Sequence, residues 1–395
     1  MDPKEFLNAA QERKAAIIAH RRVLHQNPEV GTSLPHTIEY VRAQLHALGY
    51  EVRDICEGGL LATISGTLPG SCFLLRADMD ALVGQEETEL PFRSQNKAMH
   101  ACGHDMHTAM LLGAAALLQQ YRTQLRGTVK LVFQPDEEGF TGAKAMLAAG
   151  VLENPAPGGA LALHVHSGTP SGMVLYGENT LMAGCTVFSI AAEGTGCHGA
   201  APEAGVDPIN IAAHIYSALQ AMLSREIPPK SPVSLTFGQF IAGNAPNVIP
   251  QTAILRGTLR CFDPKLTENI LQRIQELSSS IAKGFRGKAR VEVCAQVPPL
   301  MNDPSLTAEM VASSRVLLGE ASLFRIPEGG MGSEDFSVFS QALPCTYLML
   351  GAGSREEDPR FGQPMHNPKV VFNEDVLPIG AALEAWCAIK WLNRH

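Results

Sequence analysis

The stretch DMHTAMLLGAAALLQQYRTQLRGTVKLVFQ, residues 105–134, decides the fold class of this 395-residue chain. Its first part, residues 105–121, is apolar on every side and predicts a buried helix. Its last part, residues 128–134, is a short apolar run that is typical of a strand. Helix-like and strand-like segments alternate on both sides of this stretch. We therefore expect an α/β domain with a mixed, mostly parallel sheet flanked by helices.

The middle of the chain follows a different order of elements. Asp207-Pro208 and Asp263-Pro264 each offer a helix N-cap followed by a first-turn proline. Strand-like segments surround the two helices, at residues 186–193, 233–240, 253–262 and 289–297. The order β-α-β-β-α-β predicts a ferredoxin-like unit. We therefore predict an inserted satellite domain at 185–297, with the larger, catalytic domain made of 1–184 and 298–395.

Composition excludes several classes of function. The net charge is −8 and no basic run is present, which argues against nucleic-acid partners. The longest helix-like apolar run, residues 109–118, is far below the roughly 20 residues that cross a bilayer, so we expect no membrane partner. The N-terminus lacks an apolar signal core, and nine scattered cysteines fit reduced thiols. These features predict a cytoplasmic protein.

The segment MHACGHDMHTAM, residues 99–110, gathers three histidines, a cysteine and an aspartate just before the apolar helix. Cys102 and His104 fall in the loop before that helix, where α/β sheets often place a site. Three interpretations compete: a metal site, a thiol nucleophile beside its base, or polar residues that merely cap a helix. His107 lies inside the helix, and we interpret it as a structural histidine; His100 is left open.

Other segments favour the metal interpretation. Glu137 and Glu138 directly follow a strand, so one carboxylate could bind metal while the other faces a metal-bound water. His164 ends an apolar strand, and His366 lies in the proline-stiffened loop GQPMHNP. One thiolate, three imidazoles and a carboxylate suit borderline transition ions such as zinc, manganese, cobalt or nickel. Five ligands exceed one tetrahedral site, so we predict two divalent ions.

Eight motifs together resemble one enzyme group. They are RADMDAL at 76–82, MHACGHD at 99–105, FQPDEEG at 133–139, HGAAPEAGVDP at 198–208, NAPNVIP at 244–250, GTLR at 257–260, GSEDF at 332–336 and MHNP at 365–368. In this order and at these separations they resemble the amidohydrolase branch of the aminoacylase/carboxypeptidase G metallopeptidase superfamily. That branch includes hippurate hydrolases and auxin-conjugate hydrolases.

The resemblance implies a role for each matching residue. The implied metal ligands are Cys102, which bridges the two ions, His104, Glu138, His164 and His366. Glu137 matches the general base, and Asp80 matches an aspartate that orients ligands. In the satellite domain, which serves as a lid and commonly as a dimerisation surface, His198 matches an oxyanion-stabilising histidine that often acts across a dimer. Asn247 and Arg260 match positions that hold the substrate's carboxylate end.

These roles imply a dinuclear metal-dependent amidohydrolase that cleaves N-acyl amino acids to a carboxylic acid and a free amino acid. A metal-bridging water, activated by Glu137, is expected to attack the amide carbonyl. The resemblance also implies a homodimer or higher homo-oligomer. Three alternatives stay open: a dipeptidase or carboxypeptidase, a catalytically silent protein that binds acylated amino acids, and a hydrolase in which Cys102 is the nucleophile with His104 as its base.

Overall fold

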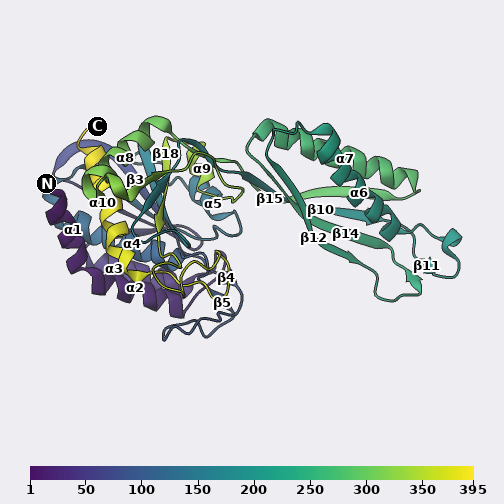
Figure 1. Cartoon of the computed structure of the whole chain (residues 1–395), viewed down its shortest axis with the longest axis horizontal. Helices are drawn as coiled ribbons and strands as arrows, with labels where there is room; N and C mark the ends of the chain where they lie inside the picture. Colours follow the sequence, from purple (N-terminus) through teal and green to yellow (C-terminus); the bar gives the residue numbers. More distant parts are fainter. The chain divides into compact units, whose positions relative to one another are not determined.

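A computed structural model describes residues 1–395, and the chain divides into two compact units (Figure 1). The first unit comprises Met1–Leu181, Met301–Gly329 and Asp335–His395, and the second comprises Met182–Leu300 and Gly330–Glu334. Each end of the segment Met182–Leu300 differs by three residues from the insert predicted at 185–297.

One short segment is placed differently from the sequence prediction. Gly330–Glu334 belongs to the second unit, although it was predicted to lie in the larger domain. The reason is local pairing, since Gly330 forms an isolated bridge with Met182 and Arg260 Nη1 donates to the Met331 carbonyl oxygen at 2.9 Å. The chain therefore passes directly from the second unit into the first between Glu334 and Asp335.

The first unit is built on an eight-stranded mixed sheet. Its order is β1 (Glu51–Cys56), β2 (Gly59–Ser65), β6 (Arg126–Gln134), β3 (Leu68–Asp78), β7 (Gly159–His166), β18 (Cys345–Gly351), β8 (Val174–Tyr176) and β17 (Leu323–Arg325). The four strands from β6 to β18 are parallel neighbours, and antiparallel pairs join β1 to β2, β2 to β6, and β18 to β8. This confirms the predicted mixed sheet, with its parallel strands at the centre.

Helices cover the sheet on both faces. They are α1 (Pro3–Glu12), α2 (Lys14–Gln26), α3 (Pro35–Ala47), α4 (His104–Gln120), α5 (Gly142–Ala148), α8 (Pro304–Leu318), α9 (Ser337–Ser340) and α10 (Leu377–Leu392). Helices α4 and α10 pack on β3 and on each other, whereas α5 contacts β6 and α9 contacts β18 (Figure 1). Residues 73–78 of β3 are all buried as a consequence.

Helix α4 is the buried helix predicted at residues 105–121. It begins after Gly103, whose φ of +86° belongs to the left-handed region that glycine adopts at low cost. A Cβ atom at Gly113 would lie 2.8 Å from both Ala381 and Ile17, so glycine lets α10 and α2 approach α4 closely. This close packing holds the middle of α4 against α2 and α10.

The second unit has the predicted ferredoxin-like order. Its elements are β10 (Gly184–Glu193), α6 (Pro208–Glu226), β12 (Val233–Ala242), β14 (Thr252–Cys261), α7 (Pro264–Gly284) and β15 (Lys288–Val297). The strands form an antiparallel sheet in the order β12-β14-β10-β15. Asp207 and Asp263 are the N-caps of α6 and α7, and each carboxylate accepts two backbone N–H groups. Both helix starts and the β-α-β-β-α-β order are confirmed.

The remaining elements are short. They are β4 (Leu82–Val83), β5 (Ala98–Met99), β9 (Asn179–Met182), β11 (Cys197–His198), β13 (Val248–Ile249), β16 (Leu300–Asn302) and four 3-10 turns, Arg122–Gln124, Pro202–Ala204, Glu320–Ser322 and Glu374–Val376. No helix in the chain combines the length and the apolar character that a membrane span requires. The cytoplasmic location stays a prediction.

Helix α10 carries a glutamate that makes folding pH-dependent. Glu384 is 1% exposed, and its Oε2 atom has no hydrogen-bond partner. Burial raises the pKa of this carboxyl well above its usual 4.5. Above pH 4.5 the unfolded chain releases this proton whereas the folded chain retains it, so the stability from this group is complete below pH 4.5 and is lost as the pH rises towards the folded pKa.

We therefore expect the substitution Glu384→Gln to stabilise the protein at pH 8 more than at pH 5. The gain in the free energy of unfolding caused by Glu384→Gln should increase by up to about 1.4 kcal/mol for each unit of pH, until the pH reaches the folded pKa of Glu384. Urea unfolding at both pH values measures it, with Glu39→Gln, at an exposed position, as the control. An equal effect of Glu384→Gln at both pH values would contradict the prediction.

Candidate metal centre

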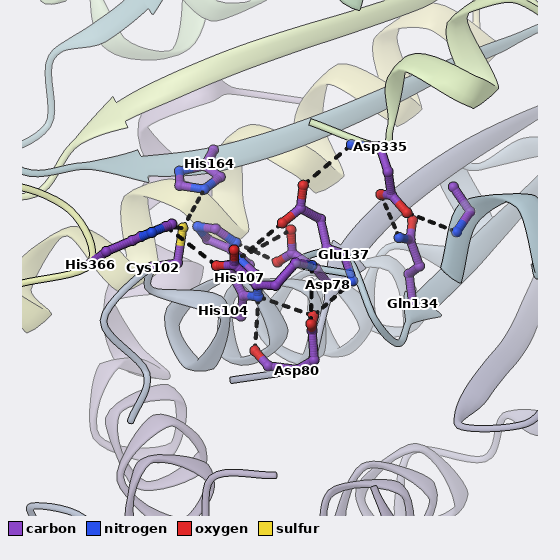
Figure 2. Close-up of polar contacts among 12 residues, drawn as sticks. Asp78, Asp80, Cys102, His104, His107, Gln134, Glu137, His164, Asp335 and His366 are labelled. Atoms are coloured by element: carbon purple, nitrogen blue, oxygen red, sulfur yellow. Dashed lines mark hydrogen bonds and ion pairs between the residues drawn. The ribbon is translucent and has the colours of Figure 1, made fainter. Parts of the chain in front are cut away.

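The candidate ligands meet where the central strands end. Strand β3 ends at Asp78, two residues before Asp80, and β6 ends three residues before Glu137. These strands are parallel neighbours, so the two loops leave the same edge of the sheet. His164 lies near the end of the next strand, β7, and the N-terminus of α4 brings His104 to the same edge (Figure 2).

Cys102 lies between two of the candidate histidines. Its Sγ atom is 3.6 Å from His164 Nε2 and 3.3 Å from His366 Nε2, although the cysteine and His366 are 264 residues apart (Figure 2). The His366 backbone N–H donates to the Ala101 carbonyl oxygen at 2.9 Å, and its φ of +67° is uncommon for a residue other than glycine. The chain thus holds His366 in an unfavourable backbone conformation that places its ring at the thiol.

Glu138 and His104 complete the group. Glu138 Oε1 lies 3.4 Å from His366 Nε2 and 4.0 Å from His104 Nε2. Three overlapping sets of potential ligand atoms lie within 4.8 Å of one another: Cys102 with His104 and His164, Cys102 with Glu138 and His366, and His104 with Glu137 and Glu138. The structure therefore brings all five predicted ligands and the predicted base together in the first unit.

The residues present fit divalent transition ions. His104 Nε2 and Glu138 Oε1 are buried and have no hydrogen-bond partner, a costly state for polar atoms that metal coordination would relieve. The donor set of one sulfur, three imidazole nitrogens and a carboxylate matches the preferences of zinc and its neighbours. The shared position of Cys102 in two of the sets agrees with a bridging thiolate.

Burial and neighbouring charges shift several pKa values in this pocket. Burial raises the pKa of the Cys102 thiol and of the Glu138 carboxyl, and it lowers the pKa of His164 well below its usual value. Burial opposes charge on His104 as well, but Asp78 and Cys102 outweigh it and raise the His104 pKa well above 6.5. Divalent cations would reverse the shifts of Cys102, Glu138 and His104 and reinforce that of His164, because they stabilise the thiolate, the carboxylate and neutral imidazole ligands.

Asp80 holds both the base loop and a ligand. Its carboxylate accepts the backbone N–H groups of Glu137 at 3.1 Å and Glu138 at 3.2 Å. Its carbonyl oxygen lies 2.8 Å from His104 Nδ1, so Nδ1–H donates there and Nε2 faces the other ligands. A hydrogen bond to the second ring nitrogen is the usual way a protein fixes a histidine ligand. These contacts support the orienting role assigned to Asp80.

Two other histidines of the quoted segment behave differently. His107 Nδ1 bonds the Asp78 carboxylate at 2.6 Å, and its Nε2 accepts the Val165 N–H at 2.9 Å. His107 is therefore a buried histidine with both ring nitrogens satisfied, as the sequence predicted. His100 is buried and neither of its ring nitrogens has a hydrogen-bond partner, and burial lowers its pKa to about 4.

Sequence reasoning missed three buried charged residues beside the centre. Arg76 Nη1 donates to Asp78 Oδ2 at 2.7 Å and its Nη2 donates to Asp335 Oδ1 at 3.0 Å. Burial would raise the Asp78 pKa, but His104, Arg76 and His107 hold it well below 3.8. Two features of the sequence could have indicated these residues. Arg76 and Asp78 are charged residues that directly follow an apolar run, and the motif GSEDF contains an acidic pair to which no role was assigned.

The second unit holds the other predicted residues. His198 pairs with Val248 in the β11–β13 ladder, and the Gly199 N–H donates to the Asn247 carbonyl oxygen at 2.8 Å, so His198 and Asn247 are neighbours. Arg260 lies eight residues beyond the start of β14, which corresponds to roughly 26 Å along an extended strand. Within this unit the structure therefore does not bring Arg260 together with His198 and Asn247.

Comparison with known proteins places this geometry in a family. Residues 74–388 match the model of peptidase family M20/M25/M40. An IAA-amino acid hydrolase (ILR1-like 4) of Arabidopsis thaliana is 36% identical over 99% of this chain and 89% of its own length. Thermostable carboxypeptidase 1 of Saccharolobus solfataricus is 36% identical over 100% of both chains, and an N-acetylcysteine deacetylase of Bacillus subtilis is 33% identical over 94% and 96%.

Solved structures give the same result. A putative aminohydrolase from methicillin-resistant Staphylococcus aureus has a TM-score of 0.88 and 30% identity, covering 99% of this chain and 100% of that one. The Bacillus subtilis protein YXEP, described as a dinuclear metal binding peptidase, has a TM-score of 0.79 and 29% identity over 97% and 99%. The predicted resemblance is confirmed, and this chain belongs to peptidase family M20/M25/M40, a family of metal-dependent hydrolases.

Proposed function

We propose that this protein hydrolyses the amide bond of N-acyl amino acids and releases a carboxylic acid and a free amino acid. The observation that carries the proposal is the position of Glu137 beside the cluster of five potential metal ligands, with its Oε2 atom 4.0 Å from His104 Nε2. The relatives named as hydrolases of amino acid conjugates and as deacetylases of N-acetylcysteine support this substrate class.

Each of the grouped residues has a role in the proposed reaction. Cys102, His104, Glu138, His164 and His366 would hold two divalent ions, which supply the Lewis acidity that lets water attack at neutral pH and polarises the amide carbonyl. Glu137 accepts the proton from the attacking water and then delivers it to the leaving nitrogen. Asp80 keeps the Glu137 and Glu138 backbones in place while this happens. The identity of the ions, zinc, manganese, nickel or cobalt, remains to be measured.

The second unit is proposed to supply the groups that bind substrate. His198 would stabilise the oxyanion, and Asn247 and Arg260 would hold the carboxylate of the amino-acid half. A substrate of two residues spans about 7 Å, far less than the length of β14 between its start and Arg260. This separation favours a homodimer in which Arg260 of one protomer and the His198–Asn247 pair of its partner act on the same substrate.

We expect Arg260→Met to raise KM for N-acyl amino acids by about 100-fold, with a smaller effect on kcat, because it removes a charge-assisted contact to the substrate carboxylate. Arg256→Met is the matched control, since Arg256 lies on the same strand and face, four residues away, and its guanidinium group donates to Gln239 of β12. Steady-state kinetics measure both variants. Equal KM values for the two would remove the assignment of Arg260.

A dipeptidase or carboxypeptidase activity is the second candidate. The thermostable carboxypeptidase of Saccharolobus solfataricus, which matches this chain end to end, favours it. One screen tests both candidates: metal-reconstituted protein is incubated with N-acetyl, N-benzoyl and indole-acetyl amino acids and with dipeptides, and the released amine is measured. Release from the acylated amino acids alone supports the first proposal, and release from dipeptides alone supports the second. No release from either set identifies a catalytically silent homologue.

A further inference from the structure

The loop that carries Glu137 and Glu138 is held at both of its ends by one carboxylate. The loop leaves β6 after Gln134 and enters α5 at Gly142. Asp335 is fully buried, and its Oδ1 accepts the Gln134 side-chain N–H at 2.6 Å while its Oδ2 accepts the Ala143 backbone N–H at 3.0 Å. Asp335 therefore ties the end of the strand to the start of the helix and fixes the span of the loop between them.

The same residue contacts the proposed base directly. The Asp335 backbone N–H donates to Glu137 Oε1 at 3.3 Å (Figure 2). The Asp80 carboxylate holds the backbone of Glu137 as described above, at the other end of the same residue. Glu137 is therefore restrained both at its main chain and at its carboxylate, and each restraint comes from a different aspartate.

Arg76 fixes Asp335 in turn. One guanidinium group contacts three partners: Nη2 donates to Asp335 at 3.0 Å, Nε donates to the Gln134 side-chain oxygen at 2.9 Å, and Nη1 donates to Asp78 at 2.7 Å. Arg76 and both carboxylates are 2% exposed or less, so water does not weaken these charge-assisted bonds. The Arg76 guanidinium, the Gln134 amide and the Ala143 N–H all donate to the Asp335 carboxylate, so both of its oxygens act as acceptors.

We propose that Asp335 is a positioning residue for Glu137 and that it acts through the geometry of the base loop rather than through contact with substrate. The inference rests on the proposed role of Glu137 as general base. A base that is displaced by a fraction of an ångström transfers its proton poorly while the substrate still binds. Loss of the Asp335 carboxylate must therefore lower kcat and leave KM and the bound metal unchanged.

The variant Asp335→Asn tests this proposal in the metal-loaded protein. The substitution keeps the shape but places an amide N–H₂ against donors. We expect kcat to fall by roughly 10- to 100-fold, with KM changed less than about twofold. The double substitution Asp335→Asn with Gln134→Glu restores the donor–acceptor match between these two side chains, although Arg76 Nη2 still faces the amide. It should therefore recover part of the lost kcat, whereas Gln134→Glu alone should be impaired.

Lys130→Met is the structural control. Lys130 is a buried residue on the same strand, β6, and its ammonium group donates to the Val151 and Glu153 carbonyl oxygens. This variant should lower the unfolding temperature and leave kcat per folded molecule unchanged. The proposal is overturned if Asp335→Asn behaves in the same way as Lys130→Met, or if the exchanged pair recovers stability without recovering kcat.

A crystal structure of the metal-loaded Asp335→Asn variant supplies a readout that does not depend on activity. The Glu137 carboxylate should be rotated or displaced relative to the wild type, with both ions and their five ligands in place. An unmoved Glu137 overturns the inference even when the wild type is active. A wild type that releases no amine from any substrate overturns the proposed function, while the position of Glu137 in the two structures still decides the inference. If the single variant does not fold, the exchanged pair is compared with Gln134→Glu by the same two measurements.

Discussion

Glu137→Gln will lower kcat by about 10³-fold and leave the two metal ions bound, because glutamine occupies the same space but accepts no proton. The side chain is buried, and the backbone contact to Asp80 does not depend on its charge. KM should change little, since Glu137 acts on the attacking water and the leaving nitrogen rather than on the substrate carboxylate. Steady-state kinetics and elemental analysis of the same sample measure the three quantities.

Glu138→Gln is the matched control for that experiment. The two glutamates are adjacent, and Asp80 accepts both of their N–H groups, yet Glu138 Oε1 points at His366 and His104. Its loss should therefore reduce the bound metal together with activity, whereas loss of Glu137 should reduce activity alone. If Glu137→Gln keeps full activity, or if both variants lose metal equally, the two assignments are wrong.

The sequence predicted the elements of this fold well where the signal is local. Asp207-Pro208 and Asp263-Pro264 cap the helices that they were expected to cap. The apolar segment after Gly103 forms α4 within one residue of its predicted limits, 105–121. Helix caps and hydrophobic periodicity depend on residues that are close in sequence, so the sequence alone is enough to predict these elements.

The candidate site was predictable only in part, because most of its geometry is non-local. Cys102 and the two glutamates stand in loops that the pattern identifies, and His104, predicted in the same loop as Cys102, is the first residue of α4. Nothing local shows that His366 reaches the thiol. Strand β3 carries the buried charges of Arg76 and Asp78 at its carboxyl end. The strand accommodates these charges because Asp335, 259 residues away, shares the guanidinium group. Compensation of this kind is visible only in three dimensions.

Arg260 shows a second limit of the sequence. The resemblance grouped it with Asn247 as a residue that holds substrate, whereas Arg260 lies eight residues beyond the start of β14 and Asn247 lies before that start, next to the β11–β13 ladder. A motif match can indicate which residues contact the substrate, but it does not indicate whether those residues belong to the same protomer. The separation inside the second unit is therefore the observation that supports the proposed arrangement of two protomers.

Removal of the metal ions will abolish activity, and the loss will be reversible. Incubation with 1,10-phenanthroline should lower kcat by more than about 100-fold, because the reaction depends on the acidity that the ions give to water. Addition of manganese, cobalt, nickel or zinc should then restore it, and the ion that restores the largest share identifies the preferred metal. Activity that survives complete removal of metal, measured on the same sample, would contradict the dinuclear proposal.

The metal-free and metal-loaded samples also distinguish two roles for Cys102, a bridging thiolate ligand and a thiol nucleophile. In the metal-free protein burial raises the pKa of Cys102, so the free thiol is a poor nucleophile. Cys102→Ser should therefore fail because it loses metal, in contrast to Cys294→Ser at an exposed position, which should keep both metal and activity. A nucleophilic Cys102 requires the opposite result: activity that a chelator spares and that iodoacetamide abolishes in the metal-loaded protein. A ligand coordinated to two cations resists alkylation, so iodoacetamide should leave the activity of the metal-loaded protein unchanged.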